Sequence, residues 1–197
     1  MHYYTNNKDA KSNEQVFDFP LRRHQMKFTT DIGVFSKKEI DFGSRLLIET
    51  FEEPQVAGGF LDVGCGYGPI GLTLAKSYSE RTVQMIDVNE RAVGLSQKNA
   101  QLNNVSNVKV YKSNIYEEVV DEFSAVLSNP PIRAGKEVVH KIIEDAKERL
   151  AVGGELWIVI QKKQGAPSAE KKMLAVYGNC ETVEKKKGYF ILKSKKD

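Results

Sequence analysis

Two short segments of the chain carry residues whose types and spacing could do chemistry. The first, 60–68, is an apolar stretch that runs into a turn containing Gly64, Gly66 and Gly68. Because glycine has no Cβ, a turn of this kind lets a ligand approach the backbone closely. The second segment, 129–132, reads Asn-Pro-Pro-Ile and places an amide at the end of another apolar stretch. Together they predict a bound nucleotide-like cofactor and a reaction at an amino nitrogen.

Asp62 stands directly before the glycine turn and indicates which cofactor the turn binds. Residues 66–71 also match the G-x-G-x-x-G pattern of dinucleotide-binding proteins, which leaves a nicotinamide oxidoreductase as an alternative. A carboxylate would repel a pyrophosphate, whereas it attracts the ammonium group of S-adenosylmethionine, a cofactor without phosphate. We therefore predict S-adenosylmethionine, with Asp62, Gly64, Cys65 and Gly66 in its site.

Two later positions offer further contacts to the same cofactor. Asp87 ends an apolar stretch about 20 residues after the glycines, where a carboxylate can accept hydrogen bonds from both ribose hydroxyls. Asn114 ends the next stretch, and its side-chain oxygen can accept from the adenine amino group or serve only as a turn residue. Val88 and Ile115 follow these two residues and are assigned to the same site.

The Asn-Pro-Pro segment predicts the reaction. Proline rings fix the backbone and end a strand, and they hold the preceding Asn129 in an extended conformation. The side-chain oxygen of Asn129 and the carbonyl oxygen of Pro130 can accept hydrogen bonds from the two N–H groups of an exocyclic amine. This aims the nitrogen lone pair at an activated methyl group, so that positioning and electrostatics do most of the work. The predicted catalytic residues are Asn129, Pro130 and Pro131.

The elements that must position these residues alternate along the chain. Strand patterns lie at 59–63, 82–88, 108–112, 123–128 and 155–160, and helical patterns lie at 69–78, 91–103, 136–150 and 169–177. This alternation predicts an α/β fold with a mostly parallel, Rossmann-like sheet and helices on both faces. Two closing strands, 180–184 and 189–193, are joined by a loop too short for a parallel crossover. The last of seven strands should therefore be antiparallel.

The first 54 residues give a weaker pattern. Residues 1–30 are polar and we assign no element to them. A capping-box spacing that begins at Ser36, followed by apolar residues at helical intervals, predicts a helix over 37–51. We expect a single domain over 1–197, in which 1–54 contribute to the substrate side and 55–197 form the cofactor-binding core.

Composition and charge limit the class of protein. The chain has 41% hydrophobic and 28% charged residues and a net charge of +3, which permits a polyanionic partner without demanding one. No signal peptide, membrane-length apolar segment, disulfide framework or metal-ligand spacing is present in the sequence, so we expect a cytoplasmic protein without a metal. Basic residues cluster near both ends, as solvated charge or as a binding surface: Arg22, Arg23, Lys27, Lys37, Lys38, Lys185, Lys186, Lys187, Lys193, Lys195 and Lys196.

Segments 61–68 and 129–131 together resemble the class I S-adenosylmethionine-dependent methyltransferases that act on amino nitrogens. Nearly the whole chain is similar to the ribosomal RNA small subunit methyltransferase C family, including 28–36, before the first expected helix. The resemblance implies methylation of guanine N2 in 16S ribosomal RNA, with ribosomal RNA or the small ribosomal subunit as partner. It further implies the compact single-domain form, because larger members carry an additional domain in front.

One position departs from the pattern of such enzymes. An aromatic residue usually follows the two prolines and stacks on the target, whereas this chain has Ile132. The resemblance makes Phe28 and Phe35 candidates for that contact, and either can equally be a core residue. Arg133 and Lys136 can meet phosphates or can be solvated charges at the start of a helix. Related enzymes modify adenine N6 or a protein glutamine, and a non-catalytic binding module is a further alternative.

Overall fold

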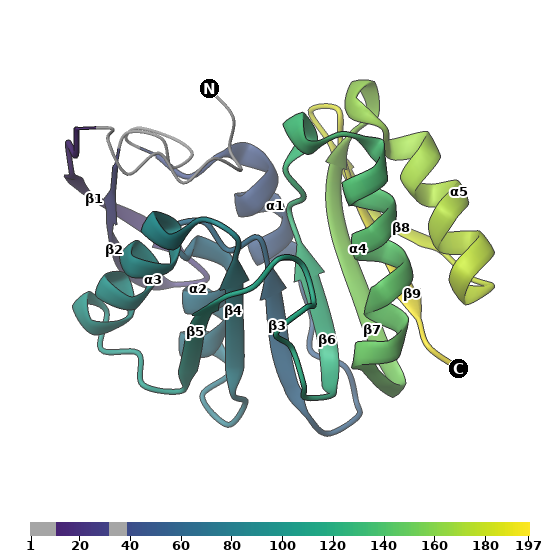
Figure 1. The fold of residues 1–197 in the computed structure, drawn as a ribbon, viewed down its shortest axis with the longest axis horizontal. Coiled ribbons are helices and arrows are strands. Elements are labelled where there is room, and N and C mark those ends of the chain that lie inside the picture. The colour runs from purple at the N-terminus through teal and green to yellow at the C-terminus, as the bar shows by residue number, and fades with distance from the viewer. Residues whose placement is uncertain (1–10, 32–38) are drawn as a thin grey trace.

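The computed structural model describes residues 11–31 and 39–197. Its main sheet has seven strands in the order β5-β4-β3-β6-β7-β9-β8 (Figure 1). Neighbouring strands are parallel except at β9, which runs antiparallel between β7 and β8. The predicted α/β fold with an antiparallel last strand is confirmed. The strand bounds are β3 (Gly59–Val63), β4 (Val83–Asp87), β5 (Val108–Lys112), β6 (Phe123–Ser128), β7 (Leu150–Gln161), β8 (Glu181–Lys186) and β9 (Tyr189–Lys195).

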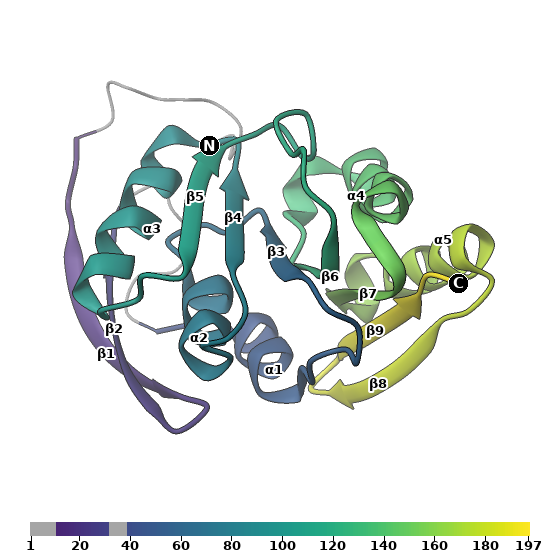
Figure 2. The same cartoon turned by 90° about the horizontal axis from the view of Figure 1, so that it is seen from below.

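Helices cover both faces of this sheet (Figure 2). One face is covered by α1 (Phe42–Thr50), α2 (Pro69–Ser77) and α3 (Glu90–Leu102), and the other by α4 (Lys136–Arg149) and α5 (Ala166–Tyr177). Two 3-10 helices, η1 (Ile132–Ala134) and η2 (Lys162–Gln164), follow β6 and β7. Each layer buries its own hydrophobic core against the sheet. The central strands are therefore apolar on both sides, which explains their continuous hydrophobic runs.

The N-terminal segment forms a hairpin that the sequence pattern did not predict. β1 (Gln15–Leu21) and β2 (His24–Thr30) pair antiparallel as a separate two-stranded sheet beside α2 and α3. The amide of Asn99 on α3 fixes the hairpin, accepting from Thr29 N at 2.7 Å and donating to Thr29 O at 2.9 Å. Its turn, Arg22-Arg23, has positive φ angles of 47° and 66° without glycine or asparagine, the usual sequence signals for such a turn.

The first helix begins later than predicted. Glu39 and Ile40 are not helical, and α1 starts at Phe42, so the predicted helix over 37–51 is wrong at its N-terminal end. Asp41 is the N-cap residue, and its carboxylate accepts a hydrogen bond from Ser44 N at 3.0 Å. Aspartate is among the strongest N-cap residues, so it defines the helix start. Residues 32–38 lie outside the described part of the chain.

The strand β7 begins earlier than predicted. The chain passes from α4 into β7 at Leu150, and Gly153-Gly154, which lie between the predicted helix 136–150 and the predicted strand 155–160, belong to the strand. Pairing with β6 shifts register here, and Gly153 has a φ of +82°. A Cβ on Gly154 would lie 2.8–3.1 Å from three carbonyl oxygens. These glycines therefore allow an irregularity inside the strand rather than a reversal of the chain.

Candidate active site

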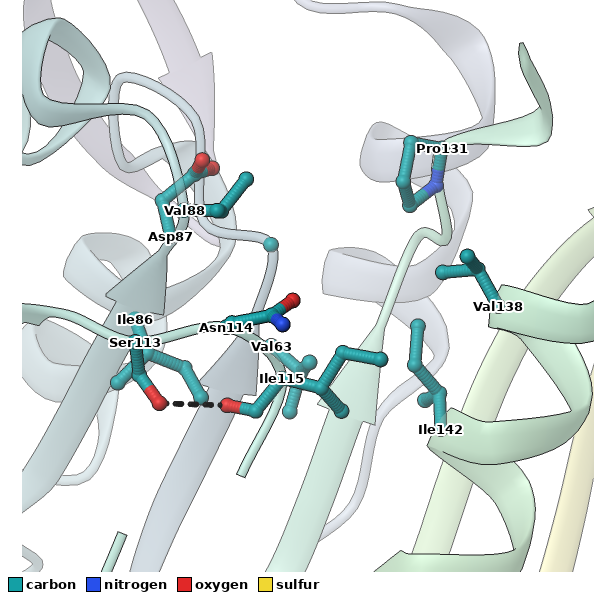
Figure 3. Close-up of a pocket in the computed structure, with 11 residues that line it drawn as sticks. Val63, Ile86, Asp87, Val88, Ser113, Asn114, Ile115, Pro131, Val138 and Ile142 are labelled. Carbon is teal, nitrogen blue, oxygen red and sulfur yellow. Dashed lines mark hydrogen bonds between the residues drawn. The ribbon is translucent and has the colours of Figure 1, made fainter. Parts of the chain in front are cut away.

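The predicted site residues gather where four parallel strands end. The glycine turn follows β3, Asp87 ends β4, Asn114 follows β5 and Asn129 follows β6. Parallel strands end at one edge of a sheet, which is where open α/β sheets bind ligands. A cleft at this edge is lined by Val63, Gly64, Ile86, Asp87, Val88, Ser113, Asn114, Ile115, Pro131, Val138 and Ile142. Figure 3 shows Asp87 and Val88 across the cleft from Pro131 and Val138.

The glycines of the turn have two different roles. Gly64 lines the cleft with a φ of +74°, and a Cβ added there would meet no atom within 4 Å. A Cβ on Gly68 would lie 3.1 Å from the Met85 side chain, and one on Gly71 only 2.6 Å from it. The later glycines of the G-x-G-x-x-G match therefore fit α2 against β4, while Gly64 leaves open space above the turn.

Asp87 ties the glycine turn to the end of β4. Its carboxylate accepts from Gly66 N and from Asn89 N, each at 2.9 Å, and the residue is 2% exposed. Cys65, next to Gly66, is buried, and burial raises the pKa of its thiol. The Cys65 thiol packs against Ser96 Oγ at 3.6 Å.

Asp62 combines a structural contact with an unpartnered atom. Its Oδ2 accepts from Gly71 N of α2 at 2.9 Å, while its Oδ1 is buried without a hydrogen-bond partner in the described structure. Burial raises the pKa of Asp62 to about 7, an effect that the Gly71 N–H opposes and the charge of Asp87 reinforces. A buried unsatisfied carboxylate oxygen is costly. It fits a site that is completed by a donor from a ligand.

The turn after β5 presents Asn114 and Ile115 to the cleft. Ile115 has a φ of +53°, an uncommon value for a β-branched residue that indicates backbone strain. The hydroxyl of Ser113 holds this turn by donating to Ile115 O at 2.9 Å (Figure 3). Asn114 is exposed, and its Nδ2 donates to Glu117 Oε1 at 3.0 Å. Its side-chain oxygen accepts no hydrogen bond from any residue in 11–31 or 39–197.

The Asn129 amide is held in one orientation by two residues that the sequence analysis missed. Its Nδ2 donates to Asp41 Oδ2 at 3.0 Å and to Ser44 Oγ at 2.9 Å. An ionised carboxylate only accepts, so the amide nitrogen must face Asp41. This leaves Oδ1 directed away from both, without a donor among the described residues. The helix start at Asp41 was the available signal, but the sequence does not show its contact with a residue 88 positions later.

The remaining predicted residues have diverse positions. Phe28 is fully buried, and its ring centroid lies 5.7 Å from that of Tyr67. Of the two roles considered for Phe28, stacking on the target or packing in the core, the structure shows the core role. Pro130 is buried, and Ile132 is half-buried against the second core. Arg133 and Lys136, the two basic residues predicted to contact the substrate, are exposed. Phe35 lies outside the described residues.

Between 11 and 31 and between 39 and 197, no group of three or more His, Cys, Asp or Glu side chains could hold a metal ion. Within the same ranges no helix is long and apolar enough to cross a membrane.

Two relatives match this chain over most of its length. The uncharacterised protein YbxB of Bacillus subtilis is 58% identical over 197 residues, covering 99% of this chain and 98% of that one. The ribosomal RNA small subunit methyltransferase C of Vibrio parahaemolyticus is 34% identical over 168 residues, covering 83% of this chain and 48% of its own. The chain thus spans about half the length of this second relative.

Solved structures support the same fold. The 16S rRNA N2 methyltransferase of Thermus thermophilus, solved in complex with AdoMet and guanosine, superimposes with a TM-score of 0.84 at 24% identity. The match covers 95% of this chain and 52% of that one. The family model of the methyltransferase small domain matches residues 25–193. The chain therefore belongs to the methyltransferase small domain family and has the fold of the class I methyltransferases, which take their methyl group from S-adenosylmethionine.

Proposed function

We propose that this protein transfers a methyl group from S-adenosylmethionine to N2 of a guanine in 16S ribosomal RNA. The observation that carries the proposal is the fixed orientation of the Asn129 amide. With Nδ2 bound to Asp41 and Ser44, the acceptor Oδ1 is left for a substrate N–H. An acceptor suits an amino group, whereas a hydroxyl nucleophile would need a base.

The residues that line the cleft, together with Asp62 directly before them in β3, fit the cofactor. The unpartnered Asp62 Oδ1 offers an acceptor for the ammonium group, and the open space over Gly64 leaves room for the ligand against the backbone. Asp87 would accept from the ribose hydroxyls. When bound, S-adenosylmethionine supplies an electrophilic methyl group. The side chains of Val88 and Ile115 would enclose the adenine, with Asn114 near its amino group.

The chain itself orients the nucleophile. Asn129 Oδ1 and the Pro130 carbonyl oxygen accept from the two N–H groups of the exocyclic amine. These two hydrogen bonds turn the nitrogen lone pair toward the methyl donor and stabilise the positive charge that develops on nitrogen. Pro131 stiffens the loop, because its ring fixes φ. The proton is released after transfer, so no strong base is needed.

The choice of guanine in 16S ribosomal RNA is supported by relatives and by position. The Vibrio parahaemolyticus relative is named for the small subunit ribosomal RNA, and the Thermus thermophilus structure contains guanosine. We propose that residues 1–54 contribute to the substrate side of one domain with the cofactor core at 55–197. The contact of Asp41 and Ser44 with Asn129 supports that arrangement. A ribosomal substrate implies action in the cytoplasm.

A labelled-methyl assay tests the proposal. Wild-type protein and S-adenosylmethionine with a labelled methyl group are incubated with 16S ribosomal RNA, small subunits, tRNA, DNA and a release factor. Nucleoside and peptide analysis then identifies the product. Label in N2-methylguanosine from 16S ribosomal RNA is the expected result. Label in N6-methyladenosine or in methylglutamine would replace the proposal with one of these substrates, and no label in any sample would overturn it.

A further inference from the structure

The turn between β8 and β9 lies at the same edge of the sheet as the end of β6, which Asn129 follows (Figure 1). Its two central residues, Lys187 and Gly188, have φ angles of 50° and 79°, as in the tight turns that match the twist of a hairpin. Gly188 O accepts from Lys162 N at 2.8 Å. Lys162 begins η2 directly after β7, a strand parallel to β6. The turn is therefore anchored at the edge that carries the cleft.

A continuous set of contacts joins this turn to Asn129. Lys187 Nζ lies 4.8 Å from the centroid of the Phe42 ring, and the Phe42 and Tyr189 rings lie 5.5 Å apart. Phe42 is the first residue of α1, directly after Asp41, which holds the Asn129 amide. Two strand spacings separate β6 from β9, and the turn lies three to four residues beyond the level of Asn129 along β9, so the two are roughly 15–20 Å apart. A polymer bound at the turn can reach the cleft within a few of its units.

Exposed cations gather along this edge without acidic partners. Within 11–31 and 39–197, none of them forms an ion pair, although exposed Glu137 and Glu184 lie among them. We call this set the basic rim: Arg133 and Lys136 beside η1, Lys162 and Lys163 in η2, and 185–187 in the hairpin. Like charges held together destabilise the folded chain unless something else compensates them.

Other basic residues of the chain are used differently. Arg22 donates to Ile48 O and Phe51 O at 2.8 Å each, at the end of α1 that lies away from Asn129. Lys27 pairs with Asp18 at 3.8 Å. The N-terminal basic cluster is thus partly structural. The residues of the C-terminal basic cluster lie at two different edges of the sheet. Residues 185–187 belong to the basic rim, and 195–196 end β9 at the opposite edge.

We infer that RNA docks through its phosphates on the basic rim and that the β8–β9 turn is its main anchor. Phosphate contacts set the register of a nucleic acid, so that the target base enters the cleft at Asn129. The rim lies beside the half-buried rings of Phe42 and Tyr189. The inference rests on the proposed function, because it requires an RNA substrate.

The experiment replaces the three hairpin lysines, 185–187, together with glutamine. The probe is the 16S ribosomal RNA fragment that carries the methylated base. We expect the Kd for the fragment to rise about tenfold or more, with the slope of log Kd against log salt reduced by about 2 to 3. Affinity for S-adenosylhomocysteine should stay unchanged, and kcat at saturating RNA should stay within about twofold.

Two control variants separate charge from folding. A triple variant with Arg23, Lys171 and Lys195 changed to glutamine removes the same charge elsewhere and should bind RNA like wild type. Changing 185–187 to arginine should restore binding, because arginine keeps the charge. Equal Kd values for the hairpin variant and wild type would overturn the inference. If wild type still methylates RNA in that case, the proposed function stands. A wild type that neither binds nor methylates RNA would overturn both.

Discussion

At the scale of single residues, the site depends on how one amide is held. Asn129 has the residue type for the proposed reaction, and Asp41 and Ser44 fix its orientation by accepting from both of its N–H donors. A free amide could present either end to a substrate. The carboxylate of Asp41 removes that choice, because it has no hydrogen to donate.

Asn129→Ala should remove the acceptor without disturbing the cofactor. We expect kcat for methyl transfer to fall about 10²–10³-fold, the usual cost of removing one preorganised polar group. Affinity for S-adenosylhomocysteine, measured by calorimetry, should remain within about twofold of wild type. Normal turnover in this variant would exclude the proposed role of Asn129.

Asp41→Asn tests the orientation of the amide. Asparagine keeps the helix cap, so the unfolding temperature should change little. Asp41 Oδ2 accepts from both Ser44 N and Asn129 Nδ2, so an asparagine oxygen in its place keeps both contacts without the charge and holds the Asn129 amide more weakly. We expect kcat to fall roughly 3- to 10-fold with an unchanged KM for S-adenosylmethionine, the magnitude of one hydrogen bond. If both constants match wild type, Asp41 only caps α1.

Asp62→Asn tests the buried carboxylate through pH. The folded pKa of about 7 lies above the ordinary 3.8, so the folded state keeps its proton to higher pH than the unfolded chain. Wild-type stability should therefore decline from about pH 4 to about pH 7 relative to the variant. The difference in unfolding free energy should grow by up to about 4 kcal/mol over that range. Chemical denaturation at several pH values measures it, and parallel curves would contradict the assignment.

The same variant reports on the cofactor. Asparagine retains an acceptor for Gly71 N–H but carries no charge to attract an ammonium group. The affinity of the Asp62→Asn variant for S-adenosylhomocysteine should therefore fall. This loss should occur even though, without ligand, the variant gains stability relative to wild type as the pH rises toward 7. Equal affinity would show that Asp62 serves only to hold α2.

At the scale of elements, the glycines of the turn serve the packing of α2 as much as the ligand. Gly71 lies on α2 where a Cβ would approach Met85 Sδ to 2.7 Å. The helix therefore lies closer to β4 than any larger residue would allow. The predicted helix α2 and strand β4 are both present. The short distance between them is what requires glycine at position 71.

Gly71→Ala should destabilise the protein by about 1–3 kcal/mol, because the buried methionine must move to admit the methyl group. Gly94→Ala is the matched control. Gly94 also lies within a helix, α3, but a Cβ there meets nothing within 4 Å. That variant should gain about 0.5–1 kcal/mol from the better helix propensity of alanine. Thermal or urea unfolding compares the two, and similar effects would contradict the packing argument.

At the scale of the whole molecule, the cleft and the fold share the same hydrogen bonds. Asp87 joins the glycine turn to the end of β4 through Gly66 N and Asn89 N. The strand ends that form the cleft are thus held together before any ligand binds. Ligand binding and global stability should consequently be linked.

Asp87→Ala should reveal that linkage. For wild type, S-adenosylhomocysteine at 100 times its Kd should add about 2.7 kcal/mol to the unfolding free energy. The variant should lose about 2 kcal/mol without ligand, since two backbone N–H groups lose their acceptor. It should also gain little from the same ligand concentration. Thermal unfolding with and without ligand measures both effects, and a full ligand-dependent gain would exclude the ribose assignment.

Much of the fold followed from local pattern. The alternation of apolar runs and helical repeats after residue 59 predicted the sheet, and the short C-terminal loop predicted its antiparallel last strand. The polar hairpin 15–30 was missed because its turn, Arg22-Arg23, lacks the usual turn residues. The start of α1 was misplaced because two capping signals compete within a few positions, and Asp41 prevails over the one that begins at Ser36.

From residue 59 onward, the sequence alone was enough to predict the order of elements and the strand ends at which polar residues stand, because hydrophobic periodicity and glycine or proline turns act over a few neighbours. Only the tertiary structure decided which distant residues meet there. It placed Asp41 against Asn129, Phe28 in the core and the β8–β9 turn at the edge of the sheet that carries the cleft. Such contacts depend on how whole layers pack, and no spacing along the chain encodes them.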